Sequence, residues 1–261
     1  MQLISLNTWG GKFFDPLLQF IKQNASDVDI FCFQEIYKTL SNTKQYSGIR
    51  ANLLEEIETI LPNFQAFYFP TLTGFDDEAK SVDFDLTYGV AIWIKRPIIV
   101  NTHTDYFIYK TGSEQPLKDD FSNLATPLQY ISFNIEGKTF AIFNFHGTPF
   151  PADKLDSKRR LTEARSVKKI IDRQKGAKIL VGDFNLLPET QSIQIIEEDM
   201  RNLIKEFSIQ RTRSKLSPFY GKTDFQRFAD YTFVSDNIEV KSFQIPRIEI
   251  SDHLPMILEF S

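Results

Sequence analysis

Short apolar runs with the composition of β-strands alternate along the chain with longer segments of helical periodicity, and this alternation restricts the fold to the α/β classes. Strands are expected at residues 3–7, 30–34, 89–94, 130–135, 139–145, 178–181, 231–234 and 257–260. Helices are expected from Asp15, as N-cap before Pro16, and at residues 49–61, 157–173 and 193–207. The runs at 30–34 and 178–181 lack polar alternation, which is typical of strands buried on both faces.

Polar side chains suited to catalysis stand where these strands end. Acidic, amide and imidazole groups occupy such positions at Asn7, Glu35, His146, Asp183, Asn185, Asp252 and His253. Because α/β folds build their sites in the crevice at strand ends, we expect these side chains to share one site. Burying a bare carboxylate is costly, so we expect Glu35 to be solvated, paired or bound to a cation.

Two short motifs carry most of this chemistry. Gly182-Asp183-Phe184-Asn185 follows a buried strand, and its acid and amide could together orient a water and a phosphate oxygen. Ser251-Asp252-His253 places an acid beside an imidazole just before the last strand. Taken alone, each motif is also typical of an ordinary turn, and a lone histidine such as His146 is more often structural.

The available donor atoms favour a hard divalent cation. Carboxylate and amide oxygens suit Mg²⁺ or Mn²⁺, whereas zinc favours histidine and cysteine. A three-histidine zinc site would consume all 3 histidines, including His103 in a segment expected to be a loop. Cys32 is the single cysteine, so an intramolecular disulfide and a CxxC redox pair are excluded, and its apolar surroundings predict a buried thiol.

Taken together, seven segments resemble, in order and content, the motifs of the endonuclease/exonuclease/phosphatase superfamily with its deoxyribonuclease I-like fold. These segments are LISLNTW (3–9), FQE (33–35), YGVAI (88–92), NFH (144–146), GDFN (182–185), DYTFVS (230–235) and SDHLP (251–255). The resemblance implies a four-layer α/β sandwich, in which two packed mixed β-sheets are flanked by helices. It also implies a single domain over residues 1–261.

A divalent-metal site follows from the same resemblance. In that family the asparagine of the first strand and the glutamate of the Gln-Glu motif help to hold the metal, roles that fall here to Asn7 and Glu35. The aspartate of the Ser-Asp-His motif, here Asp252, also lies beside the metal. The implied cofactor is Mg²⁺ or Mn²⁺.

The resemblance implies catalytic roles for five further residues. His253 would act on the scissile phosphate as a base or a transition-state stabiliser, and Asp230 would orient its ring. Asp183 and Asn185 would position the attacking water and the phosphate. His146 would contact the phosphate or the leaving group.

Some departures from the family pattern bear on the substrate. Trp9 replaces the acid that abasic-site endonucleases of this family carry two residues after the first-strand asparagine, and the Asn-x-Trp-Gly start is similar to the neutral sphingomyelinase branch. The Cys-Asp-Arg motif of the inositol-phosphatase branch is absent. Ala229 stands where many members have an arginine, so either Arg227 takes its place or the phosphate is held differently.

These observations predict a metal-dependent phosphoesterase, with a phosphodiesterase or nuclease as the default and nucleic acid among its candidate partners. The alternative is a small-molecule or lipid-headgroup phosphoesterase, and a catalytically silent binding domain is a third class. The net charge of −4 favours a compact substrate over a long polyanion. Residues 154–178, with ten basic and three acidic side chains, favour the opposite unless they form the solvated face of a helix.

Two segments, 71–87 and 102–126, are expected to be loops that form the rim of the site and choose the substrate. The acidic residues of the first could equally form a solvated surface. The chain shows no signal-peptide pattern and no apolar run long enough to span a membrane. We therefore expect a cytoplasmic protein without stable membrane association.

Overall fold

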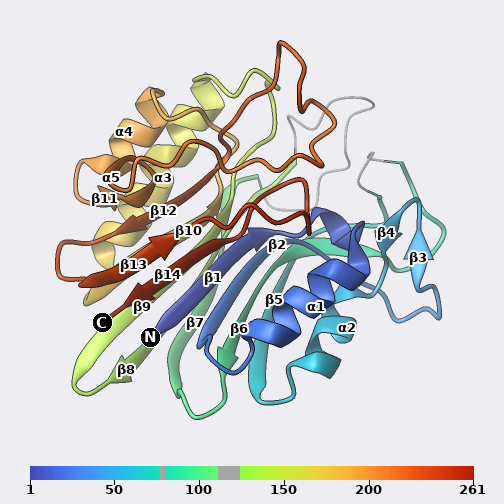
Figure 1. Cartoon of the computed structure of the whole chain (residues 1–261), viewed down its shortest axis with the longest axis horizontal. Coiled ribbons are helices and arrows are strands. Elements are labelled where there is room, and N and C mark those ends of the chain that lie inside the picture. Colours follow the sequence, from blue (N-terminus) through green and yellow to red (C-terminus); the bar gives the residue numbers. More distant parts are fainter. Residues whose placement is uncertain (77–79, 111–123) are drawn as a thin grey trace.

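Two six-stranded sheets pack face to face in the computed structural model, which describes residues 1–76, 80–110 and 124–261 (Figure 1). The first sheet has the order β13 (Val240–Gln244), β14 (Met256–Phe260), β1 (Gln2–Asn7), β2 (Ile30–Lys38), β6 (Thr87–Lys95) and β5 (Phe64–Thr73). The second has the order β11 (Arg201–Asn202), β12 (Asp230–Val234), β10 (Ala177–Asp183), β9 (Lys138–His146), β8 (Thr126–Ile135) and β7 (Val100–Tyr109). A small hairpin joins β3 (Gln45–Tyr46) to β4 (Ile49–Arg50).

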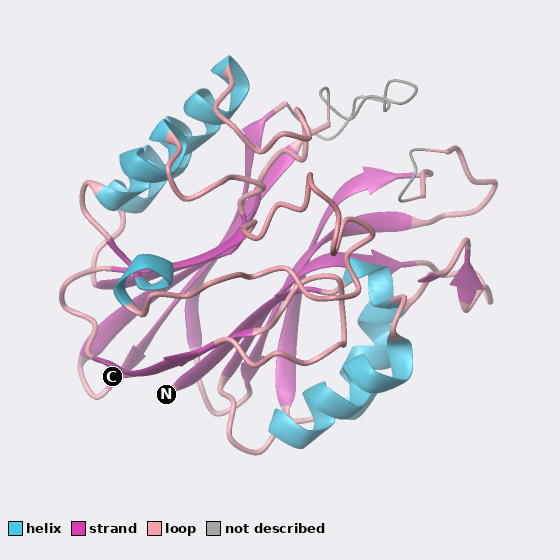
Figure 2. Cartoon of the chain, turned by 45° about the horizontal axis from the view of Figure 1, so that its top comes forward, coloured by secondary structure: helices cyan, strands magenta, loops and turns pink. Residues whose placement is uncertain are grey.

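Helices cover the outer face of each sheet, on opposite sides of the molecule (Figure 2). The first sheet carries α1 (Phe14–Asn24) and α2 (Leu53–Ile60), whose Leu17 and Ile57 join Phe31 and Trp93 in one apolar cluster. The second carries α3 (Lys158–Arg173), α4 (Gln191–Glu197) and the short α5 (Leu203–Glu206). A 3₁₀ turn, η1 (Trp9–Gly11), follows β1. The four-layer α/β sandwich predicted from the sequence is confirmed.

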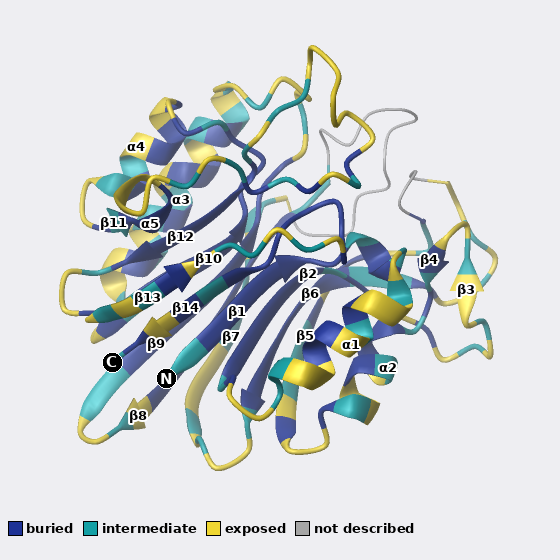
Figure 3. Ribbon diagram, viewed as in Figure 1, coloured by how far each residue is buried: buried dark blue, intermediate teal, exposed yellow. Residues whose placement is uncertain are grey.

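The core between the sheets is built from the long apolar strands (Figure 3). Leu3, Cys32 and Ile92 of the first sheet share a cluster with Ile142 and Phe233 of the second, and each is at most 1% exposed. Cys32 is buried as predicted, and burial raises the pKa of its thiol. Because both faces of these strands are covered, near-continuous apolar runs are the sequence pattern that such sheets require.

Strand register brings the polar strand ends to one edge of the sandwich. β1 runs parallel to β2 and pairs Asn7 with Gln34. β10 runs parallel to β9 and pairs Asp183 with His146, while the antiparallel β12 pairs Asp230 with Asp183. Gly182 permits this contact, because a Cβ there would lie 1.9 Å from the carbonyl oxygen of Phe145.

Glu35 was expected at the end of its strand, but the strand continues past it. β2 continues to Lys38, and Glu35 sits in a bulge between Gln34 and Ile36 with a φ of 58°. The extra residue of a bulge re-aims its side chain relative to the regular alternation. The strand therefore supplies an apolar core surface on both sides of Glu35 and still turns this carboxylate toward the site.

Among the longer strands, β5, β7 and β13 were missed or taken for loops. β7 occupies residues 100–109 of a segment predicted as a loop from 102, and β5 extends into the other predicted loop as far as Thr73. β13 had no sequence prediction. The remainder of the two predicted loops includes residues 77–79 and 111–123, which lie outside the described residues.

Three helix boundaries also differ from expectation. α1 is N-capped by Phe13 and places Asp15 in its first turn, so Asp15 is not the cap. α2 begins at Leu53, because Ile49 belongs to β4. The helix predicted at 193–207 is interrupted by β11, and Asn202 caps the separate α5 by accepting a hydrogen bond from the Ile204 amide. In the described part of the chain, no helix combines the length and apolarity needed to cross a membrane.

Candidate active site

A cavity of ≈ 790 Å³ opens at the sheet edge where β2, β9 and β10 bring their polar residues. Six of the eight predicted site residues line it: Glu35, His146, Asp183, Asn185, Asp252 and His253. The other two, Asn7 and Asp230, are buried behind it and hydrogen-bonded to its lining. The structure therefore brings all eight together.

Asp230 and His253 form a buried hydrogen-bonded pair. Nδ1 of His253 lies 2.8 and 2.9 Å from the two carboxylate oxygens of Asp230. On the other side of the ring, Arg213 donates a hydrogen bond to Nε2, so Nδ1 carries the imidazole proton. Burial, reinforced by Arg213, lowers the pKa of His253 to about 4, and its ring is neutral at pH 7. The alternative interpretation of this motif, an ordinary turn with a histidine on the surface, is excluded because His253 is 3% exposed.

Asp183 is a buried carboxylate held in one orientation by two donors. Asn7 Nδ2 donates to one oxygen at 3.0 Å, and the backbone amide of Asn185 donates to the other at 2.9 Å. Burial would raise the pKa of Asp183, but His253 and Lys154 outweigh it and lower that pKa to about 2. Asp183 is thus ionised at neutral pH, and His253 Nε2 lies 3.6 Å from its Oδ2.

His146 also lies beside Asp183. Its Nδ1 is 3.2 Å from the hydroxyl of Tyr88, and its Nε2 is 3.8 Å from Asp183 Oδ2. Burial lowers the pKa of His146 to about 4. Its ring is therefore neutral at pH 7 and offers one N–H donor and one acceptor to the site.

Three cationic side chains that were not among the predicted site residues line the cavity, and two of them, Lys154 and Arg213, contact predicted residues. Lys154 donates a hydrogen bond to Asn185 Oδ1, and burial lowers its pKa to about 8. Arg213 donates to Asp252 Oδ2 at 2.6 Å as well as to His253. Arg213 brings a guanidinium to the cavity, whereas Arg227 does not line it. No local motif marks Arg213, because it lies in a long irregular segment.

Unusual backbone geometry is concentrated at this cavity. Among the described residues, eight that are not glycine have a positive φ, and four of them line the cavity: Trp9, Glu35, Lys154 and Asn185. Such conformations are unfavourable for L-residues and persist where the surrounding structure enforces them, which is typical of functional sites. For Trp9 the enforcing contacts include a hydrogen bond from its amide to Asn7 Oδ1.

The donor set of the cavity fits a hard divalent cation. Glu35 and Asp252 present carboxylate oxygens to it, the ligand type that Mg²⁺ and Mn²⁺ prefer. Asn7 turns its amide nitrogen to Glu35 Oε1 at 3.0 Å, while its oxygen accepts the Trp9 amide, so in this arrangement it orients Glu35. A second group, Asp183, Asp230 and His253, has donor atoms within 4.8 Å of one another and could also hold an ion, although Asp230 is already engaged by His253.

A three-histidine zinc site is not formed. His103 lies on β7, 3.0 Å from Asp105 Oδ1, and packs against the ring of Phe67. It does not line the cavity that His146 and His253 share.

Both segments predicted as rim loops contribute to the cavity wall. Thr71, Leu72 and Asp76 come from the first, and residues 124–126 come from the end of the second. Asp76 is 3% exposed, so this acid is part of the wall and not of a solvated surface.

The fold recurs in solved structures at low sequence identity. A mannosyl-6-phosphatase from Bacteroides thetaiotaomicron is 18% identical with a TM-score of 0.69, covering 100% of this chain and 99% of that chain. A family protein from Leptotrichia buccalis is 16% identical with a TM-score of 0.70, covering 100% and 99%. The catalytic domain of human Nocturnin with bound sulfate is 15% identical with a TM-score of 0.66, covering 100% and 93%. These likenesses show a shared fold.

Comparison with curated protein sequences gave no match. The family model described as "Endonuclease/Exonuclease/phosphatase family", by contrast, matches residues 4–253. This match spans β1 through His253 and thus includes all eight predicted site residues. The chain therefore belongs to the endonuclease/exonuclease/phosphatase family, whose members hydrolyse phosphate esters.

Proposed function

We propose that this protein hydrolyses phosphodiesters with the help of a divalent cation, with nucleic acid as the default substrate. The observation that supports this most is that three kinds of group meet in one cavity. They are the ionised carboxylate of Asp183, the neutral imidazole of His253 oriented by Asp230, and the cationic side chains of Lys154 and Arg213. Phosphoryl transfer needs these parts: a group that directs water, and positive charge for the developing oxyanions. We also propose that the chain forms a single domain and acts in the cytoplasm.

The chain's own residues would divide the reaction between them. Asp183, ionised and fixed by two donors, accepts a hydrogen bond from the attacking water and takes its proton as the new P–O bond forms. Lys154 and Arg213 stabilise the charge on the phosphate oxygens. His253, held by Asp230, would lie against the phosphate, and His146 would lie beside the leaving oxygen. The leaving oxygen departs from the face opposite the water with the electron pair of the broken P–O bond and takes up a proton from solvent.

Glu35 and Asp252 are the carboxylates that would hold the cation, and Asn7 would keep Glu35 in place. When bound, Mg²⁺ or Mn²⁺ supplies positive charge that offsets the charge developing on the phosphate. Arg213 donates to Asp252 Oδ2 at 2.6 Å and so fixes the orientation of this carboxylate.

A compact phosphate ester is the second candidate. The cavity is walled on one side by apolar residues, including Leu72, Pro127 and Phe150, and Asp76, Asp153 and Asp224 also line it. Acids near the phosphate position disfavour a long polyanion by repulsion. The mannosyl-6-phosphatase that shares this fold is a phosphatase by name.

The test is hydrolysis of bis(p-nitrophenyl) phosphate and of p-nitrophenyl phosphate, with Mg²⁺ or Mn²⁺ and then with EDTA. We expect metal-dependent cleavage of the diester, lost by at least a hundredfold in Asp183→Asn. Asp172→Asn, a change of the same charge on exposed α3, is the matched control and should keep full activity. Cleavage of the monoester alone would favour the second candidate, and equal losses in both variants would contradict the role of Asp183.

A further inference from the structure

A second hollow, of ≈ 580 Å³, lies beside the catalytic cavity and is strongly basic. We call it the basic groove and define it by its five cations, Arg211, Lys215, Lys222, Arg227 and Arg247. Glu249 is its single carboxylate, so the side chains of the groove carry a net charge of about +4 (five cations against one anion). In a protein with a net charge of −4, this is a local reversal of sign.

The cations of the basic groove are available to a ligand. Among residues 1–76, 80–110 and 124–261, no carboxylate forms an ion pair with any of the five. All but Arg211 are exposed, and Nε of Arg211 is buried without a hydrogen-bond partner in the described structure.

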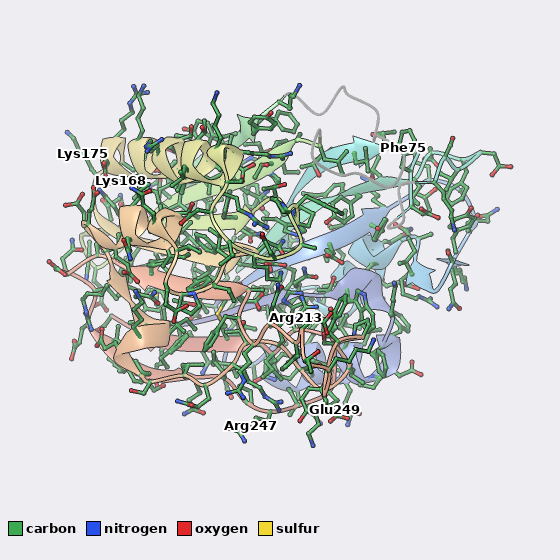
Figure 4. The ribbon with its side chains drawn as sticks, turned by 90° about the horizontal axis from the view of Figure 1, so that it is seen from above. Phe75, Lys168, Lys175, Arg213, Arg247 and Glu249 are labelled. Atoms are coloured by element: carbon green, nitrogen blue, oxygen red, sulfur yellow. The ribbon has the colours of Figure 1, made fainter. Side chains whose placement is uncertain are left out.

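One segment separates the basic groove from the catalytic cavity. Between residues 210 and 227, the side chains divide between the two hollows. Arg213, Phe219 and Gln226 line the cavity, whereas Arg211, Tyr220 and Arg227 line the groove. At the other end of the wall, His253 lines the cavity and Leu254 lines the groove. Figure 4 shows Arg213, Arg247 and Glu249 on the same side of the molecule, away from Lys168. A ligand bound in the groove would therefore lie next to the catalytic cavity, where the scissile phosphate is proposed to bind.

Aromatic rings give the basic groove a second kind of contact. Tyr220 and Phe225 line it with ring centroids 5.2 Å apart, and the guanidinium of Arg211 lies 5.3 Å from the Tyr220 ring. Positive charge that follows a backbone, together with rings on which bases stack, is the combination that binds single-stranded nucleic acid. The concave, largely polar groove is also unlike a surface that would dock on a flat lipid bilayer.

We propose that the basic groove binds the phosphates of a single-stranded nucleic acid whose scissile phosphate lies in the catalytic cavity. The inference rests on the proposed function for the cleavage step, but binding to the groove can be measured without cleavage. It extends the catalytic site to a substrate-binding surface formed by the basic groove.

Binding of a fluorescein-labelled oligothymidylate 12-mer in EDTA tests the proposal by fluorescence anisotropy. The variant Arg227→Gln/Arg247→Gln removes two charges from the groove, and Arg165→Gln/Arg173→Gln removes two exposed charges from α3. We expect the groove variant to bind about tenfold more weakly, with a salt slope smaller by about 1.4, and the α3 variant to bind within about twofold of wild type. Lys215→Gln/Lys222→Gln is a second groove variant, and thermal melts confirm that each variant folds.

Equal weakening in the groove and α3 variants would overturn the proposal, because any positive charge would then serve. So would groove-dependent binding to phosphatidylserine vesicles with no binding of the oligonucleotide, which would assign the groove to a lipid surface. Hydrolysis of bis(p-nitrophenyl) phosphate separates this inference from the proposed function. We expect both groove variants to retain wild-type rates on that ester, and a wild type that binds the oligonucleotide but cleaves no ester would refute only the proposed function.

Discussion

The protein has two basic regions, and they differ in how their cations come together. Residues 154–178 are a conspicuous basic stretch in the sequence, and three of its ten cations are ion-paired: Arg159 with Glu163, Arg160 with Asp153, and Lys168 with Asp172 and Asp199. The basic groove draws its cations from separate parts of the chain, and none of the five has an ion-pair partner among the described residues. This concave cluster of unpaired positive charge is assembled by the fold, so a charged run in the sequence does not locate it.

Within the basic stretch, Lys154 lines the catalytic cavity and donates a hydrogen bond to Asn185. We expect Lys154→Met to lower kcat on bis(p-nitrophenyl) phosphate by about 10²- to 10³-fold, since it removes a partly buried cation of the cavity. Lys169→Met, on the exposed surface of α3, should leave kcat unchanged. Comparable losses in the two variants would place the function of the stretch on its exposed surface.

Arg160 shows the structural use of charge in the same stretch. Its side chain is 1% exposed and donates to the carbonyl of Leu155 at 2.6 Å and to that of Pro151, so it fixes the loop that carries Lys154. Arg160→Met should lower the free energy of unfolding by about 2 kcal/mol, because these two carbonyl groups lose a charged donor. Urea denaturation measures this, and an unchanged midpoint would show that the loop is held by other contacts.

The pH dependence should also separate the two regions. Burial lowers the pKa of Lys154 to about 8, so its positive charge is present below that pH and lost above it. We expect kcat to fall between pH 8 and pH 9.5, whereas oligonucleotide binding should persist because guanidinium groups stay charged. A fall in both, with the same midpoint, would indicate that Lys154 and not the basic groove dominates binding.

The smallest effect is expected at Lys168. It pairs with Asp172 at 3.0 Å and with Asp199, both exposed, and such surface pairs contribute little. Lys168→Gln should change neither diester hydrolysis nor oligonucleotide binding by more than about twofold. A larger loss of binding would extend the nucleic-acid surface onto α3.

The sequence was most informative where the chemistry is local. Asp183 and Asn185, or Asp252 and His253, lie within single motifs at strand ends, and the family resemblance joined these motifs into one site. The family resemblance implied the four-layer arrangement, and strands such as β2 and β10, which are apolar on both faces, agree with it because such strands require a sheet covered on both sides.

The rest depended on tertiary context. β5 and β7 are edge strands and half-exposed, so their apolar pattern is weak, and Pro70 within β5 argues against a strand except at an edge. The bulge that re-aims Glu35 is invisible in an apolar run. Arg213 reaches the site from an irregular segment, and no periodicity marks which of its neighbours face the cavity and which the groove.

Mg²⁺-dependent cleavage of an end-labelled oligothymidylate 12-mer tests whether one wall joins a hydrolytic cavity to a phosphate-binding groove. We expect Arg227→Gln/Arg247→Gln to lower kcat/KM on the 12-mer by about tenfold, with no change on bis(p-nitrophenyl) phosphate. Arg165→Gln/Arg173→Gln should change neither rate. Equal rates on the 12-mer for wild type and the groove variant would show that the groove does not bind the strand that the cavity cleaves.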